Sequence, residues 1–158
     1  MKRGSTVILR AVIFLIGFIV LAICILALPR LITAEMAAGA DFDYGAIFLG
    51  LYVPAIPFFY ALHQALKLLS FIDANQAFSE GSVRAFRHIQ YCAYAISGLF
   101  TAGMPYIFYV ANKDDAPGVA AIGLVIISAS FVIGTFAAVM LKLVQSALDI
   151  KSENDLTV

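Results

Sequence analysis

Charge and cysteine are both scarce in this 158-residue sequence. Asp, Glu, Lys and Arg make up 13% of it, roughly half the share found in soluble domains. Ten basic and ten acidic residues balance, so nothing in the charge would attract nucleic acid, and no direct nucleic-acid partner is expected. Two cysteines cannot build a disulfide framework. The remainder is 63% hydrophobic with a mean hydropathy of +0.97, which favours a membrane protein.

Four stretches contain no Asp, Glu, Lys or Arg. They cover residues 11–29, 44–66, 88–112 and 116–141. Each is about as long as the roughly 20 helical residues that cross a bilayer core, and none alternates as barrel strands do. The sequence therefore predicts an all-α, integral membrane four-helix bundle that forms a single domain.

The basic residues lie mostly on one side of these spans. Eight of the ten are Lys2, Arg3, Arg10, Lys67, Arg84, Arg87, Lys142 and Lys151, and the other side has only Arg30 and Lys113. The positive-inside rule places the richer side in the cytoplasm. Both termini, the loop 70–87 and the tail 149–158 are therefore predicted to be cytoplasmic.

The loop 70–87 carries a helix-start signal. Ser79 is a typical N-cap, Glu80 suits the first turn, and Phe78 and Val83 occupy hydrophobic-staple positions. The third helix should thus begin near Glu80, with amphipathic early turns at the lipid head groups. The alternative is a docking face for a partner. The fourth helix is expected to reach about Ile150, which leaves a short polar tail.

Chemistry-bearing residues are few within the spans. No acid or base lies there except His63 and His88 near the cytoplasmic boundary, which argues against an ion-coupled transporter. His63, His88 and Cys92 are weak candidates for a metal site, but boundary histidines beside a small apolar filler explain them better. We expect no metal, no cofactor and no enzymatic activity.

Helix-packing patterns are more frequent. Ser130, Gly134 and Ala138 form a small-residue stripe, which closes the bundle or, alternatively, forms a homo-oligomer face. Pro54 and Pro57 should kink the second helix, because each removes a backbone donor.

Two segments resemble a known family. The stretch from Asn75 to Ile89 is similar to the cytoplasmic loop of an uncharacterised bacterial family of four-helix membrane proteins, in which Asn is commoner at the position of Gly81. The ending from Ser152 to Val158 resembles the same family's acidic tail. The resemblance implies a bacterial cytoplasmic (inner) membrane and a frequent genetic neighbour, a small helix-turn-helix regulator. No catalytic residue can be transferred from a family of unknown function.

The leading hypothesis is a non-enzymatic accessory or regulatory membrane protein that contacts a cytoplasmic partner, such as that transcriptional regulator. The alternative is a small-molecule or lipid permeability factor that uses the proline-containing second helix. The candidate partner-binding residues are Phe78, Ser79, Arg84, Arg87, Glu153, Asp155 and Leu156.

Overall fold

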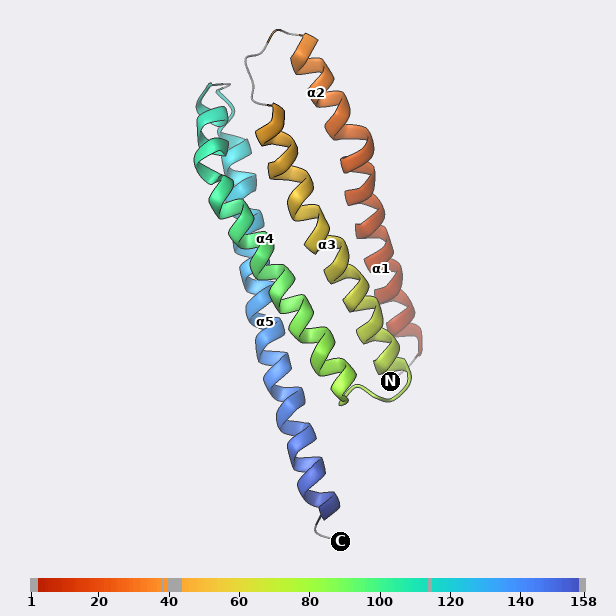
Figure 1. Cartoon of the computed structure of the whole chain (residues 1–158). Coiled ribbons are helices and arrows are strands. Elements are labelled where there is room, and N and C mark those ends of the chain that lie inside the picture. Colours follow the sequence, from red (N-terminus) through yellow and green to blue (C-terminus); the bar gives the residue numbers. More distant parts are fainter. Residues whose placement is uncertain (1–2, 38, 40–43, 114, 157–158) are drawn as a thin grey trace.

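Every element in the described part of the chain is a helix. The computed structural model describes residues 3–37, 39, 44–113 and 115–156. Its elements are α1 (Arg3–Ala22), the π-helix η1 (Ile23–Ala27), α2 (Leu28–Ala37), α3 (Tyr44–Asp73), α4 (Glu80–Lys113) and α5 (Pro117–Leu156). The elements α1, η1 and α2 follow one another directly and form one long rod (Figure 1).

Four helices are long and apolar enough to cross a membrane, as the sequence predicts. The candidate spans lie within Gly4–Ala34, Gly50–Asp73, Glu80–Lys113 and Pro117–Asn154. Large apolar side chains point outward over much of their length, among them Phe18, Ile56 and Val125, which are 70%, 71% and 66% exposed. Such exposure suits a lipid environment, where apolar side chains gain nothing from being inside the protein.

The helices pack mainly with their neighbours in sequence. The most extensive contacts join α4 to α5, followed by α3 to α4 and then α1 to α3. The α1–η1–α2 rod lies on the side of α3 away from α5 (Figure 1). The best-buried helix is α4, which packs against both α3 and α5, and the rod is attached chiefly through α3.

Small residues allow α4 and α5 to approach closely. A side chain on Gly134 would collide with the ring of Tyr94, because its Cβ would lie 2.7 Å from the ring atom Cε1. The buried Ser97 hydroxyl donates to the carbonyl oxygen of Ile127 at 3.3 Å. Gly134 therefore closes an intramolecular contact, which is one of the two roles predicted for its stripe.

The turn between α4 and α5 is tight. Asp115 has a φ of 50°, and the amide of Ala116 donates to the carbonyl oxygen of Ala111 at 2.9 Å. This six-residue closure is typical of a Schellman-type helix end. Pro117 then starts α5, at a position where a missing amide hydrogen costs little.

Two helices extend further than predicted. Helix α3 continues to Asp73, so the connection between α3 and α4 is only residues 74–79. Helix α5 continues to Leu156, so the prediction of an end near Ile150 was wrong by about six residues. Nothing between Lys151 and Leu156 breaks a helix, because this segment has neither glycine nor proline. The helix α3 runs unbroken through Pro54 and Pro57, and the kink there remains a prediction.

Candidate functional site at the charged end

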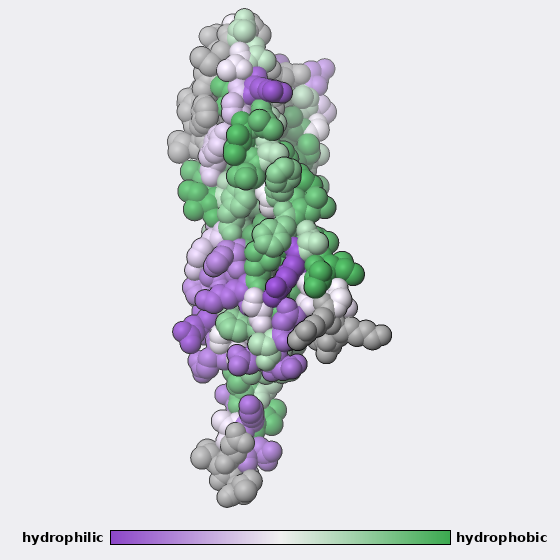
Figure 2. All heavy atoms as spheres, turned by 90° about the vertical axis from the view of Figure 1, so that its right-hand side faces the viewer, coloured by the Kyte–Doolittle hydropathy of each residue, from purple (hydrophilic) through white to green (hydrophobic). Residues whose placement is uncertain are grey.

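The polar side chains gather at one end of the helices. There α1 begins, α3 ends, α4 begins and α5 ends, and we call this region the charged end (Figure 1). Figure 2 shows hydrophilic atoms collected around that end, below a broad band of hydrophobic atoms. Six basic side chains that the structure describes lie there: Arg10, Lys67, Arg84, Arg87, Lys142 and Lys151.

The connection between α3 and α4 begins with a well-formed helix cap. Asn75 has a φ of 56°, which asparagine tolerates better than most residues. Its amide donates to the carbonyl oxygen of Ile72 at 3.1 Å, and the amide of Gln76 donates to that of Phe71 at 2.8 Å. These two bonds form a Schellman motif, which ends α3 and turns the chain toward α4.

The start of α4 is fixed by two serines. The prediction that Ser79 caps this helix is confirmed, because its hydroxyl accepts the amide of Ser82 at 3.3 Å. Ser82 is fully buried, and its hydroxyl donates to the carbonyl oxygen of Gln76 at 3.2 Å. The connection is therefore tied to the helix that follows it.

Gly81 has a packing reason that the sequence did not reveal. A Cβ at this position would lie 2.6 Å from the ring atom Cζ of Phe71 on α3. The ring of Phe71 thus occupies space that a side chain would need, and it presses directly against the backbone of α4. The glycine brings the two helices closer at the charged end.

An ion pair joins α1 to α3. The Arg10 guanidinium contacts a carboxylate oxygen of Asp73 at 2.8 Å and donates to the hydroxyl of Ser70 at 3.2 Å. Both charged side chains are partly exposed, at 40% and 32%. Sequence reasoning missed this contact, because 60 or more residues separate the partners and neither lies in a recognisable motif.

The predicted partner-binding residues fall into three groups. Phe78 is 62% exposed, more than a closed hydrophobic staple with Val83 would leave it, and Arg84 and Arg87 are also exposed. Ser79 is half-buried and acts as a cap. Glu153 is exposed on the last turns of α5.

The last two candidates lie at the very end of the described chain. The backbones of Asp155 and Leu156 belong to the final turn of α5, and their side chains lie outside the described residues. Asp155 and Leu156 therefore have a helical backbone, and their contacts with a partner stay a prediction.

The candidate metal ligands are not brought into one site. The Nδ1 atom of His88 lies 2.7 Å from the carbonyl oxygen of Arg84, and its ring meets the ring of Tyr60 edge to face. His63 is exposed and Cys92 is buried. Within the described ranges, no three His, Cys, Asp or Glu side chains are grouped in a way that could hold a metal.

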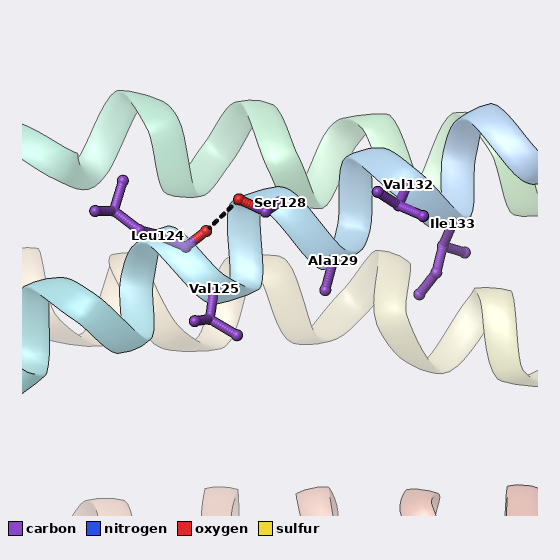
Figure 3. Close-up of a pocket in the computed structure, with 6 residues that line it drawn as sticks. All are labelled: Leu124, Val125, Ser128, Ala129, Val132 and Ile133. Atoms are coloured by element: carbon purple, nitrogen blue, oxygen red, sulfur yellow. Dashed lines mark hydrogen bonds between the residues drawn. The ribbon is translucent and has the colours of Figure 1, made fainter.

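A shallow depression lies on the outer face of α5. It has a volume of about 540 Å³ and is lined by Leu124, Val125, Ser128, Ala129, Val132 and Ile133 (Figure 3). Its single hydroxyl, on Ser128, donates to the carbonyl oxygen of Leu124 at 2.9 Å. All six residues come from one helix and no charge is among them, so this is an apolar surface without catalytic groups.

A second depression of about 840 Å³ lies between α4 and α5. Its hydroxyl groups already have nearby partners. Ser97 donates to the carbonyl oxygen of Ile127, Thr101 donates to that of Ser97, and the Tyr94 hydroxyl lies 3.4 Å from that of Thr135. Ser97 and Tyr94 thus join α4 to α5, while Thr101 bonds within its own helix.

Comparison with known proteins gives one consistent result. The family described as "Protein of unknown function (DUF2975)" matches residues 5–158. The chain is also 52% identical over 160 residues to the uncharacterized membrane protein YoaS of Bacillus subtilis (strain 168), with each chain covered completely. No solved structure matches the chain.

Proposed function

Because the chain belongs to the DUF2975 family of proteins of unknown function, we propose a role from its geometry: a non-enzymatic membrane protein that holds a cytoplasmic partner protein at its charged end. The role is accessory or regulatory. The partner is a soluble protein, such as a helix-turn-helix transcriptional regulator, and the charged end faces the cytoplasm under the positive-inside rule.

The observation that carries this proposal is the length of α5. The helix has 40 residues, about 60 Å at 1.5 Å per residue, against a bilayer core of roughly 30 Å. Its last turns project well beyond the start of α4 (Figure 1). A helix that leaves the packed structure in this way offers its sides to another molecule.

The charged end also exposes apolar side chains next to charges. Ile150 is 68% exposed on α5, and Phe78 is 62% exposed just before α4. Lys151 and Glu153 are exposed beside Ile150. Apolar anchors with a charged surround are the usual composition of a protein-binding patch, since the anchors supply affinity and the charges supply selectivity.

The arrangement of polar groups favours binding over catalysis. Among the described residues that line the depressions, the hydroxyls of Ser97, Thr101 and Ser128 donate to backbone carbonyl oxygens, and the Tyr94 hydroxyl lies 3.4 Å from that of Thr135. Neither depression contains an acid, a base or a paired nucleophile. The permeability alternative therefore gains no support from these surfaces, and the projecting helix is better explained by a partner.

The test is photo-crosslinking in the native membrane. A photoreactive amino acid replaces Ile150 in one full-length variant and Phe78 in a second. A third carries it at Val125, which is 66% exposed in the apolar depression of α5 and serves as the matched control. Crosslinked products are identified by mass spectrometry.

The expected result is one soluble protein captured from Ile150 and Phe78 and absent from Val125. Its capture should fall when Lys151 and Glu153 are replaced by alanine while membrane insertion is unchanged. If Ile150 and Phe78 capture only lipid or copies of the same chain, the proposed function is wrong.

A further inference from the structure

One face of α3 changes from apolar to basic toward the charged end. Ile56, Tyr60, His63 and Lys67 recur at intervals of three or four residues, which places them on the same side of the helix. Ile56 is 71% exposed, Tyr60 is 45% exposed, and His63 and Lys67 are exposed. This face is therefore open to its surroundings over about three turns.

A matching face runs along the first turns of α4. Arg84, His88, Tyr91 and Ala95 follow the same three- and four-residue spacing. Tyr91 is 64% exposed, Arg84 and Ala95 are exposed, and His88 is half-buried. Here too a basic end is followed by aromatic and then apolar surface.

Two contacts join these faces. The rings of Tyr60 and His88 lie 5.7 Å apart in an edge-to-face arrangement. The ring of Phe71 packs against Gly81 nearer the connection. Together they set the register of the antiparallel pair, so that Lys67 lies level with the first turns of α4, where Arg84 is found.

The cations of this surface are not neutralised within the described part of the chain. Lys67, Arg84 and Arg87 are exposed and form no salt bridge there, in contrast to Arg10, which is paired with Asp73. Glu80, one turn before Arg84, forms no ion pair with it. We call Lys67, Arg84 and Arg87, with the two histidines between them, the α3–α4 cation face.

The depth of the cation face matches the head-group layer. The charge-free stretches of α3 and α4 end at Leu66 and begin at His88, so Lys67 and Arg87 are the first charges beyond the apolar core. Tyr60 and Tyr91 lie on the membrane side of these charges, where tyrosines anchor helices at the interface. Ile56 and Ala95 continue the surface toward the bilayer centre.

We propose that the α3–α4 cation face binds the phosphate of an anionic phospholipid, such as phosphatidylglycerol, with one acyl chain along Ile56 and Ala95. Basic surfaces between transmembrane helices are suited to anionic head groups. A phospholipid can place its phosphate on the cations and its acyl chain on the adjoining apolar surface, whereas a soluble anion would use the cations alone. The lipid is therefore the source of the phosphate.

The test uses the absence of tryptophan from the chain. The full-length Tyr91→Trp variant has a single fluorescent reporter beside the cation face. It is reconstituted in vesicles of equal phosphatidylglycerol and phosphatidylcholine, with brominated acyl chains on one lipid or the other. Bromine quenches on contact, so the two samples give the relative binding constant of the two lipids at this position. Both leaflets contain both lipids, so the direction of insertion does not affect the result.

We expect phosphatidylglycerol to bind roughly fivefold more strongly than phosphatidylcholine for each cation engaged. Lys67→Gln with Arg84→Gln should lower the ratio by about this factor for each cation removed, while Lys142→Gln with Lys151→Gln, a matched loss of charge on α5, should preserve it. A ratio near one in the parent Tyr91→Trp protein overturns the proposal without any further variant.

Two other outcomes also overturn it. Equal losses in the two double variants would show a general charge effect in place of a site. Inorganic phosphate that abolishes the preference, when chloride at the same ionic strength does not, would show a site for a soluble anion. Survival of the preference in phosphate supports the lipid.

Discussion

The hydroxyl of Tyr52 on α3 donates a 2.6 Å hydrogen bond to the backbone carbonyl oxygen of Cys24 on η1. This carbonyl has lost its helical partner. The amide of Leu28, which would serve it in an α-helix, bonds to Ile23 instead, and the next residue is Pro29, which has no amide hydrogen. Tyr52 thus provides a donor for the carbonyl oxygen that the π-turn leaves unpaired, and it ties the α1–η1–α2 rod to α3.

Tyr52→Phe should therefore loosen this attachment. In the apolar layer no water replaces the lost donor, and interhelical hydrogen bonds in membranes contribute about 0.6 kcal/mol on average and up to about 1.7 kcal/mol. We expect a decrease of about 1 kcal/mol in the free energy of unfolding in mixed micelles. Tyr109→Phe, at a tyrosine that is 62% exposed, is the matched control and should change stability by only a few tenths.

A double-mutant cycle of Tyr52→Phe and Pro29→Ala tests whether Tyr52 replaces the amide donor that Pro29 lacks. The alanine restores an amide hydrogen within reach of the Cys24 carbonyl oxygen, so Tyr52→Phe should cost less in that background. Equal costs with Pro29 and with alanine would show that the hydrogen bond does not substitute for the missing amide.

Local signals in the sequence located the four long helices and one boundary correctly. The spans follow from the absence of charge over some 20 residues, and Ser79 marks the start of α4 because capping depends on the nearest few residues. The last turns of α5 were assigned to a tail because they are polar, although polar residues outside the bilayer form helices readily.

Contacts between distant segments could not be predicted in the same way. The Arg10–Asp73 pair, the Tyr52–Cys24 bond and the ring of Phe71 over Gly81 each join residues whose meeting depends on how the helices pack. In an apolar sequence, a glycine or a tyrosine could pack against or bond to many different residues, and the sequence does not say which. For this reason the sequence could place the candidate site at the charged end, and the structure was needed to identify which residues there contact one another.

Gly134→Ala should destabilise the α4–α5 pair. The added Cβ would lie 2.7 Å from Tyr94, whose ring is already held by Phe131 and Thr135. Overpacking of this kind costs about 1 to 3 kcal/mol. Thermal unfolding in detergent should show a lower Tm for this variant, while Gly98→Ala, with no atom within 4 Å of the new Cβ, should not lower it.

Tyr94→Leu tests whether the clash with the Tyr94 ring is what destabilises Gly134→Ala. The smaller side chain makes room for the new methyl group, so Gly134→Ala should be less harmful when combined with Tyr94→Leu. Additive effects of the two substitutions would contradict the close contact.

Ser82→Ala should loosen the connection between α3 and α4. Its fully buried hydroxyl holds the carbonyl oxygen of Gln76, and removal leaves that group without this donor, at a cost of about 1 to 2 kcal/mol. Amide hydrogen exchange should speed up within residues 74–79 and remain unchanged in the α4–α5 turn. Ser146→Ala, at an exposed serine on α5, should leave both segments unchanged.

The pairing of Arg10 with Asp73 should contribute modestly and depend on salt. Both side chains are partly exposed, and exposed ion pairs contribute about 0 to 1 kcal/mol. A double-mutant cycle of Arg10→Gln and Asp73→Asn, followed by unfolding in micelles at low and high salt, measures their coupling directly. We expect roughly 0.5 kcal/mol at low salt and less at high salt, because mobile ions screen the attraction. A coupling that is unaffected by salt would mean that the Arg10 bond to Ser70, and not the charge on Asp73, holds α1 against α3.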